Sequence, residues 1–134
     1  MLIPYTIVPS DDGPDMYVPV VNVHIAKLEC RERPEVFLPA ILDTGATYSL
    51  FPAEVGWDIG LEIEAGRRQE TILSNGQTME FFIHTARLWI GDFVIDLEVG
   101  FGDEVGFPVL GRVGFFQRFR VSFDHSSFEI LPRH

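Results

Sequence analysis

The residues best suited to chemistry lie in the stretch ILDTGATYSLFP, from Ile41 to Pro52, where an ionisable aspartate follows an apolar segment. Two large aliphatic residues precede Asp43, and the small residues Thr44, Gly45 and Ala46 follow it. Placing a carboxylate at the end of a buried strand is costly, and a carboxylate held there can accept and donate protons in acid–base catalysis. The pattern makes Asp43 the first candidate for a catalytic group.

A purely structural explanation of the same stretch competes with the catalytic one. Asp, Thr and Gly are common in turns, because an aspartate side chain accepts hydrogen bonds from nearby backbone amides and Gly adopts backbone angles that other residues avoid. On this interpretation Asp43 merely ends a strand. Taken alone, the four residues leave both interpretations open.

The composition limits the class of protein. The 134 residues suit one domain covering residues 1–134, and 46% of them are hydrophobic, with apolar runs too short and interrupted to cross a membrane. The start of the chain has none of the features of a secretory signal. We therefore expect a globular cytoplasmic protein that has no membrane partner.

The charge balance argues against nucleic acid as a partner. Twenty acidic and ten basic side chains give a formal net charge of -10, which repels a phosphate backbone. The single cysteine, Cys30, excludes an intrachain disulfide bond. It follows a strand-like run, so we expect it to be buried as a small hydrophobic residue.

Short strands separated by turns dominate the expected secondary structure. Val21, Val23 and Ile25 alternate as in a strand with one buried face, and the segment 35–43 predicts a second strand region that ends at Asp43. Residues 52–60 favour a short helix that starts near a proline and stops at a glycine.

Two turn signals and a possible second helix follow. Asn75-Gly76, between ETIL and TMEFF, predicts a hairpin, and Gly91-Asp92 predicts another turn. A helix is possible over Phe115–Phe119, and two last strands flank the DHSS turn at residues 124–127. Many short strands with one or two brief helices predict a mostly β barrel or sandwich.

A second apolar string, Val109-Leu110-Gly111, follows the hairpin later in the chain. With these features the sequence resembles the retropepsin-like aspartic peptidases, the clan that includes retroviral proteases and similar small bacterial proteins. The resemblance spans residues 17–131. It rests on three segments, which read ILDTGA, TILSNGQTMEF and PVLGRVGFFQRF.

The resemblance implies a single-lobe retropepsin-like acid protease barrel that works as a homodimer. In peptide hydrolysis of this type one group takes a proton from water while another donates a proton, and two carboxylates that share one proton do both. The chain has one Asp-Thr-Gly string, so Asp43 of a second copy would supply the second carboxylate. The implied activity is that of an aspartic endopeptidase acting on a peptide or protein substrate.

The resemblance also implies roles for the residues around Asp43, which form the expected catalytic set with Thr44 and Gly45. The Thr44 hydroxyl would donate a hydrogen bond across the two-fold axis, and the Gly45 amide would donate toward the carboxylates. Ala46 would stay small beside the substrate, and Thr47 would contact it.

The hairpin and the later apolar string complete the implied site. The hairpin tip would form a flap that closes over the substrate and contacts it through Ser74, Asn75, Gly76 and Gln77. Gly111 would let the backbone pass beneath the catalytic loop, and residues 112–119 would form a short helix behind it.

The sequence departs from the retroviral pattern at two places. Retroviral members often carry an acidic residue four positions after the catalytic aspartate, where it meets an arginine; here that position is Thr47, so Arg112 loses its expected partner. The flap tip is polar rather than apolar. A catalytically silent peptide-binding or assembly module therefore stays open as an alternative, as does a monomer with half a site.

Other chemistry finds little support in the sequence. The four histidines show no metal-ligand spacing, and the glycines fit neither nucleotide-binding fingerprint. We assign no metal and no cofactor. The histidines considered are His24, His84, His125 and His134.

Overall fold

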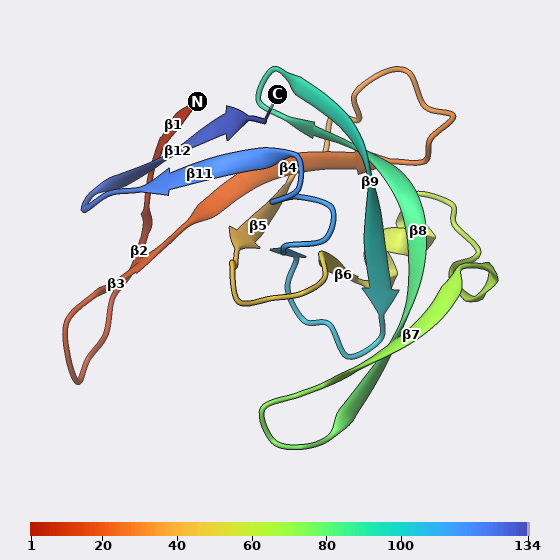
Figure 1. The fold of residues 1–134 in the computed structure, drawn as a ribbon, viewed down its shortest axis with the longest axis horizontal. Helices are drawn as coiled ribbons and strands as arrows, with labels where there is room; N and C mark the ends of the chain where they lie inside the picture. The colour runs from red at the N-terminus through yellow and green to blue at the C-terminus, as the bar shows by residue number, and fades with distance from the viewer. Residues whose placement is uncertain (134) are drawn as a thin grey trace.

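Across residues 1–133 the chain consists mostly of short and medium strands, with one brief α-helix and one 3-10 turn (Figure 1). The computed structural model describes residues 1–133, so His134 lies outside the described residues. The strands are β1 (Leu2–Pro4), β2 (Thr6–Val8), β3 (Met16–Val18), β4 (Val20–Ala26), β5 (Leu38–Leu42), β6 (Leu50–Pro52), β7 (Arg67–Ile72), β8 (Thr78–Ile90), β9 (Phe93–Gly102), β10 (Val109–Leu110), β11 (Phe119–Phe123) and β12 (Ser127–Pro132). The helices are α1 (Ala53–Asp58) and η1 (Ile63–Ala65).

Six strands close into a barrel. β4, β5, β10, β6, β9 and β8 pair in that order, and β4 also pairs with β8, which closes the ring. β7 extends the sheet beyond β8, and β1, β12 and β11 form a separate three-stranded sheet. The predicted mostly β, single-lobe barrel is confirmed.

The long strand β8 buries two different faces, one after the other. In its second half Ala86, Leu88 and Ile90 point into the barrel core. In its first half the opposite face is buried, where Met79 and Phe81 join a second apolar cluster with Ile83. Because side chains alternate along a strand, β8 links the barrel core to a second apolar layer beneath the hairpin that β7 and β8 form.

The predicted short helix and hairpins are confirmed. Helix α1 begins directly after Pro52, and Gly60 beyond its end has a φ of 88°. The Asn75-Gly76 pair lies at the tip between β7 and β8, and Gly91-Asp92 lies between β8 and β9. β11 and β12 pair antiparallel across the DHSS turn.

The helix predicted over residues 112–119 is wrong, because this segment forms turns. Gly114 has a φ of 96°, which a right-handed helix does not allow. The Phe115 carbonyl accepts hydrogen bonds from the amides of Arg118 and Phe119, which makes one turn before β11 begins. The buried pair of Phe115 and Phe119 therefore has helical spacing without a helix.

The predicted burial of Cys30 is also wrong. β4 ends at Ala26, and Cys30 lies in the following loop, where its side chain is exposed. Its amide donates to the Lys27 carbonyl at 3.1 Å, which closes a turn. The apolar alternation stops before the cysteine, so the strand stops there too.

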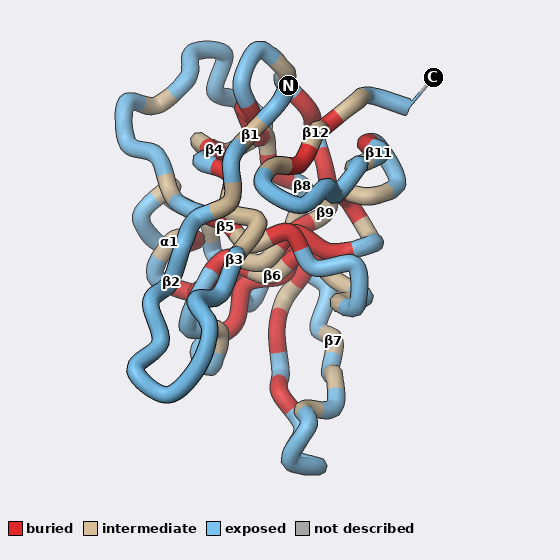
Figure 2. The backbone as a smooth tube through the Cα atoms, turned by 90° about the vertical axis from the view of Figure 1, so that its left-hand side faces the viewer, coloured by how far each residue is buried: buried red, intermediate tan, exposed pale blue. Residues whose placement is uncertain are grey.

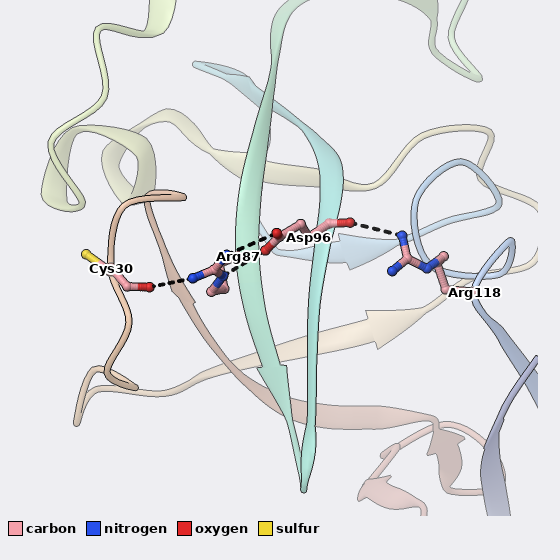
Figure 3. A network of polar contacts seen from close by, with 4 residues as sticks. All are labelled: Cys30, Arg87, Asp96 and Arg118. Atoms are coloured by element: carbon pink, nitrogen blue, oxygen red, sulfur yellow. Dashed lines mark hydrogen bonds and ion pairs between the residues drawn. The ribbon is translucent and has the colours of Figure 1, made fainter.

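A polar network on the outside of the barrel joins β8 and β9 (Figure 3). Arg87 and Asp96 face each other in register, and two guanidinium nitrogens donate to the carboxylate at 2.8 and 3.1 Å. Arg87 also donates to the Cys30 carbonyl, and Arg118 donates to the Asp96 carbonyl. The hydrogen bonds from Arg87 lower the pKa of Asp96, so the charged carboxylate is favoured in the folded chain.

We expect Asp96→Asn to destabilise the fold at pH 7 by up to about 1 kcal/mol, because the pair is partly exposed. A carboxylate whose pKa is lowered on folding stabilises the fold above its unfolded pKa and loses that effect as the pH falls through its folded pKa. The difference from the natural chain should therefore shrink below about pH 4. Urea unfolding at pH 7 and at pH 3 measures this, with Asp12→Asn in an exposed turn as control. An equal difference at both pH values would contradict it.

Candidate active site

Strand β5 carries Asp43 to its position at the edge of the barrel. Ala40 and Leu42 are buried in the core, and Leu42 lies beside Leu110 in the parallel pairing of β5 with β10. The Asp43 amide donates to the Leu110 carbonyl at 3.0 Å, so the pairing continues into the loop. Two buried strands thus fix the backbone from which the carboxylate projects.

The Asp43 side chain organises the start of the loop. The Gly45 amide donates to its Oδ1 at 2.9 Å, and the Ala46 amide donates to the Asp43 carbonyl at 3.2 Å. Asp43, Thr44, Gly45 and Thr47 are exposed, and Ala46 is half-buried. Asp43 thus accepts the hydrogen bond that a structural turn requires, and its carboxylate is still exposed to solvent. The structural role of the motif is therefore compatible with a catalytic one.

The segment Gly111–Val113 supports the loop from behind. The amides of Arg112 and Val113 donate to the carbonyls of Ala46 and Thr47 at 2.9 and 2.8 Å. A Cβ at Gly111 would lie 2.4 Å from the Tyr48 carbonyl oxygen and 2.8 Å from that of Ala46. The expectation that a glycine is needed for the backbone to pass beneath the loop agrees with this geometry.

Ser49 is a structural residue of the site that sequence reasoning missed. Its side chain is 2% exposed; Oγ accepts from the Gly111 amide at 3.0 Å and donates to the Val113 carbonyl at 2.9 Å. One hydroxyl thereby satisfies two buried backbone groups of the supporting segment. A small polar residue within a run of apolar ones, between Tyr48 and Leu50, was the available signal.

Thr47 and Arg112 contact each other, which corrects the expectation that Arg112 loses its partner. The Arg112 Nη2 donates to the Thr47 Oγ1 at 3.1 Å. A hydroxyl accepts a hydrogen bond as a carboxylate would, but without the negative charge. Arg112 therefore keeps a hydrogen bond from its charged guanidinium to a neutral hydroxyl, in place of an ion pair.

The hairpin tip is polar and exposed, and its turn has only one left-handed residue. Gly76 has a φ of 85°, and the Gln77 amide donates to the Asn75 side chain at 2.9 Å. Ser74, Asn75, Gly76 and Gln77 are all exposed (Figure 2). Within residues 1–133, no hydrogen bond joins this tip to the Asp43 loop.

The base of the hairpin, in contrast, contacts the loop through apolar side chains. Tyr48 packs its ring on Phe81 with 5.1 Å between centroids, and Leu50 packs against the same cluster. On the other face Arg68 is bound by Glu80 and Glu70, and these hydrogen bonds raise the pKa of Arg68. In the structure the loop 43–49 is therefore hydrogen-bonded to the segment 111–113, and the base of the hairpin packs against that loop.

The other polar candidates are not grouped. His24 and His84 each bond a backbone carbonyl, of Val36 and Ile63 respectively. Among residues 1–133, no three His, Cys, Asp or Glu side chains lie close enough together to hold a metal ion. No helix within the same residues is long and apolar enough to span a membrane.

The fold is similar to those of two solved structures. A retropepsin-like aspartic protease from Rickettsia conorii aligns with a TM-score of 0.67 at 18% identity, over 98% of this chain and 97% of the other. EIAV protease in complex with the inhibitor HBY-793 aligns with a TM-score of 0.54 at 19% identity, over 78% and 88%. No protein-family model and no curated protein matches the chain.

We expect Gly111→Ala to destabilise the protein by at least about 1–3 kcal/mol, because the new methyl group would collide with backbone atoms that cannot rotate away. Gly106→Ala is the matched control, since nothing lies within 4 Å of a Cβ there. Chemical denaturation of both variants measures the difference. Equal stability of the two would show that the supporting segment can shift freely.

We expect Ser49→Ala to lower stability by about 1–3 kcal/mol, because it leaves the Gly111 amide and the Val113 carbonyl without their partner. Ser122→Ala, on the exposed part of β11, should change stability by less than about 0.5 kcal/mol. Urea titrations followed by tryptophan fluorescence measure both. A loss no larger than that of the control would mean that Ser49 does not hold the segment.

Proposed function

The chain has a retropepsin-like fold, and on that premise we propose that it is an aspartic endopeptidase that acts as a homodimer. The observation that carries the proposal is the Asp43 carboxylate, held by a backbone-braced loop and left exposed at the edge of the barrel. The proposal treats residues 1–134 as one domain.

Two copies are needed because of the chemistry. The attacking water must lose a proton and the amide nitrogen must gain one as it leaves, and two carboxylates that share one proton serve both needs. The chain has one Asp-Thr-Gly string, so a two-fold axis beside Asp43 would supply the other carboxylate.

The neighbouring residues would position the substrate and the carboxylates. The Gly45 amide holds one oxygen of Asp43, which leaves the other oxygen for the water. The Thr44 hydroxyl would bond across the axis, and Ala46 and Thr47 would lie along the substrate. The tip residues Ser74 to Gln77 would close over it, and their exposure and polarity suit contacts with a peptide backbone.

One observation favours a second candidate, a peptide-binding or assembly module that does not cut. The tip residues Ser74 to Gln77 offer hydrogen bonds but no apolar side chain to exclude water from the site; the apolar residues that precede them are half-buried Leu73 and exposed Ile72. Binding of an intact peptide to a dimer that never cleaves it would support this candidate.

We expect Asp43→Asn to lower the rate of peptide cleavage by at least about 10⁴-fold, since it removes both the acid and the base. The fold should be retained, because Asn still accepts the Gly45 hydrogen bond. Mass spectrometry of a diverse peptide mixture measures cleavage, with Asp92→Asn in the exposed turn between β8 and β9 as control. Undiminished cleavage by Asp43→Asn would end the assignment.

The same assay over a pH series tests the dyad. Two carboxylates are active only while they share one proton, so the rate should peak on the acidic side of neutrality and fall on both sides. Cleavage per chain should also rise with protein concentration where dimers form. A rate that is flat from about pH 4 to pH 7 would exclude the shared proton.

A further inference from the structure

An exposed apolar hairpin at the start of the chain lacks a covering surface. Within residues 1–133, β2 and β3 pair only with each other, with Ile7 opposite Tyr17 and Val8 opposite Met16. These residues are exposed, at 54% for Ile7, 55% for Tyr17, 39% for Val8 and 57% for Met16. We call the segment from Thr6 to Val18 the N-terminal hairpin.

Both faces of the N-terminal hairpin are apolar. Because side chains alternate along a strand, Ile7 and Tyr17 occupy one face while Val8 and Met16 occupy the other. An isolated two-stranded hairpin is marginally stable in water. The rings of Tyr5 and Tyr17 meet edge to face, with 6.3 Å between their centroids. Residues of both faces are therefore left exposed within the single protomer.

The position of the N-terminal hairpin indicates which surface could cover it. In Figure 1 it projects from the barrel on the side where the loop after β5, which carries Asp43, also lies. Seen from that side in Figure 2, the hairpin lies in front, with β5 and β6 beside it. The turn between β11 and β12 points to the same side, and Phe123 at the end of β11 is 45% exposed.

A dimer built around Asp43 turns this side toward the partner. Two carboxylates that share a proton lie about 3 Å apart, so the two Asp43 loops must meet at the axis. Whatever projects beyond the loop on the same side must then run along the second protomer. We propose that the N-terminal hairpin packs against the partner protomer and that its four exposed apolar residues become buried there.

This inference rests on the proposed function, because the two-fold axis beside Asp43 sets the position of the partner. The interface would be isologous, with each hairpin contacting the same surface on the other copy. It also explains why a chain with a net charge of -10 keeps four large apolar side chains in water at one place.

The test measures association without relying on cleavage. The double variant Ile7→Glu/Tyr17→Glu should raise the dimer Kd at least about tenfold in sedimentation velocity. The control Val36→Glu/Trp57→Glu changes two residues that are at least as exposed, at 74% and 57%, in the loop before β5 and in α1, which lie on the other side of the barrel in Figure 1. The control should keep the natural Kd.

A second measurement uses the natural chain alone. Amide hydrogen exchange in residues 6–18 should slow when the protein concentration rises above the dimer Kd, because the hairpin opens less often once it is covered. Exchange that is unchanged by concentration, in a chain that does dimerise, would overturn the inference even if the double variant fails to fold.

The outcomes separate this inference from the proposed function. A Kd equal to that of the natural chain for the hairpin variant overturns the hairpin interface and leaves the peptidase intact if cleavage persists. A weakened dimer in a protein that never cleaves peptide supports the interface and removes the peptidase. A natural chain that stays monomeric at all concentrations overturns the interface, and cleavage by that monomer would also overturn the two-chain site.

Discussion

The parallel pairing of β5 with β10 is the constraint on which the rest of the site depends. It sets Asp43 beside Gly111, and the hydrogen bonds from Arg112 and Val113 to the loop carry the pairing past the ends of both strands. These contacts are between backbone groups, so they demand little of the side chains. They require a residue without Cβ at Gly111 and a buried hydroxyl at Ser49. The fold as a whole is similar to that of solved structures at identities of 18–19%.

The position of the site also depends on β8, because one face of this strand packs in the barrel core and the other packs beside the Asp43 loop. The core face anchors the strand in the barrel, and the other face carries Phe81 against Tyr48 in the loop after Asp43. Only the tip beyond Leu73 lacks such packing, and it is polar and exposed. Local opening is easiest where few apolar contacts resist it. The structure thus confines easy motion to the tip and keeps the base of the hairpin fixed relative to the loop.

The sequence predicted the features that depend on local chemistry. The Asp-Thr-Gly string, the Asn75-Gly76 tip and the helix after Pro52 each involve a few adjacent residues whose backbone preferences are strong. The predictions from sequence failed where the local structure is determined by a single residue or by a segment far away in the chain. Gly114 turns the backbone out of a helix that Phe115 and Phe119 would otherwise suggest. Strand β1 forms because it pairs with β12, and the hydrogen bonds of Ser49 are made to residues far along the chain. No local sequence pattern predicts either feature.

A carboxylate at the end of a buried strand poses a desolvation problem, and the single chain avoids it by leaving Asp43 exposed. In the proposed dimer the problem returns, because two such carboxylates would be enclosed together. One shared proton then halves the charge to be buried, and the Gly45 amides supply hydrogen bonds to what remains. The burial of apolar area by the N-terminal hairpins on association would offset the remaining desolvation free energy of the two carboxylates. In the proposed dimer, the enclosure of the carboxylates and the burial of the hairpins would therefore occur in the same association step. The exposed hairpin and the exposed Asp43 of the separate chain are the two groups that this step would cover.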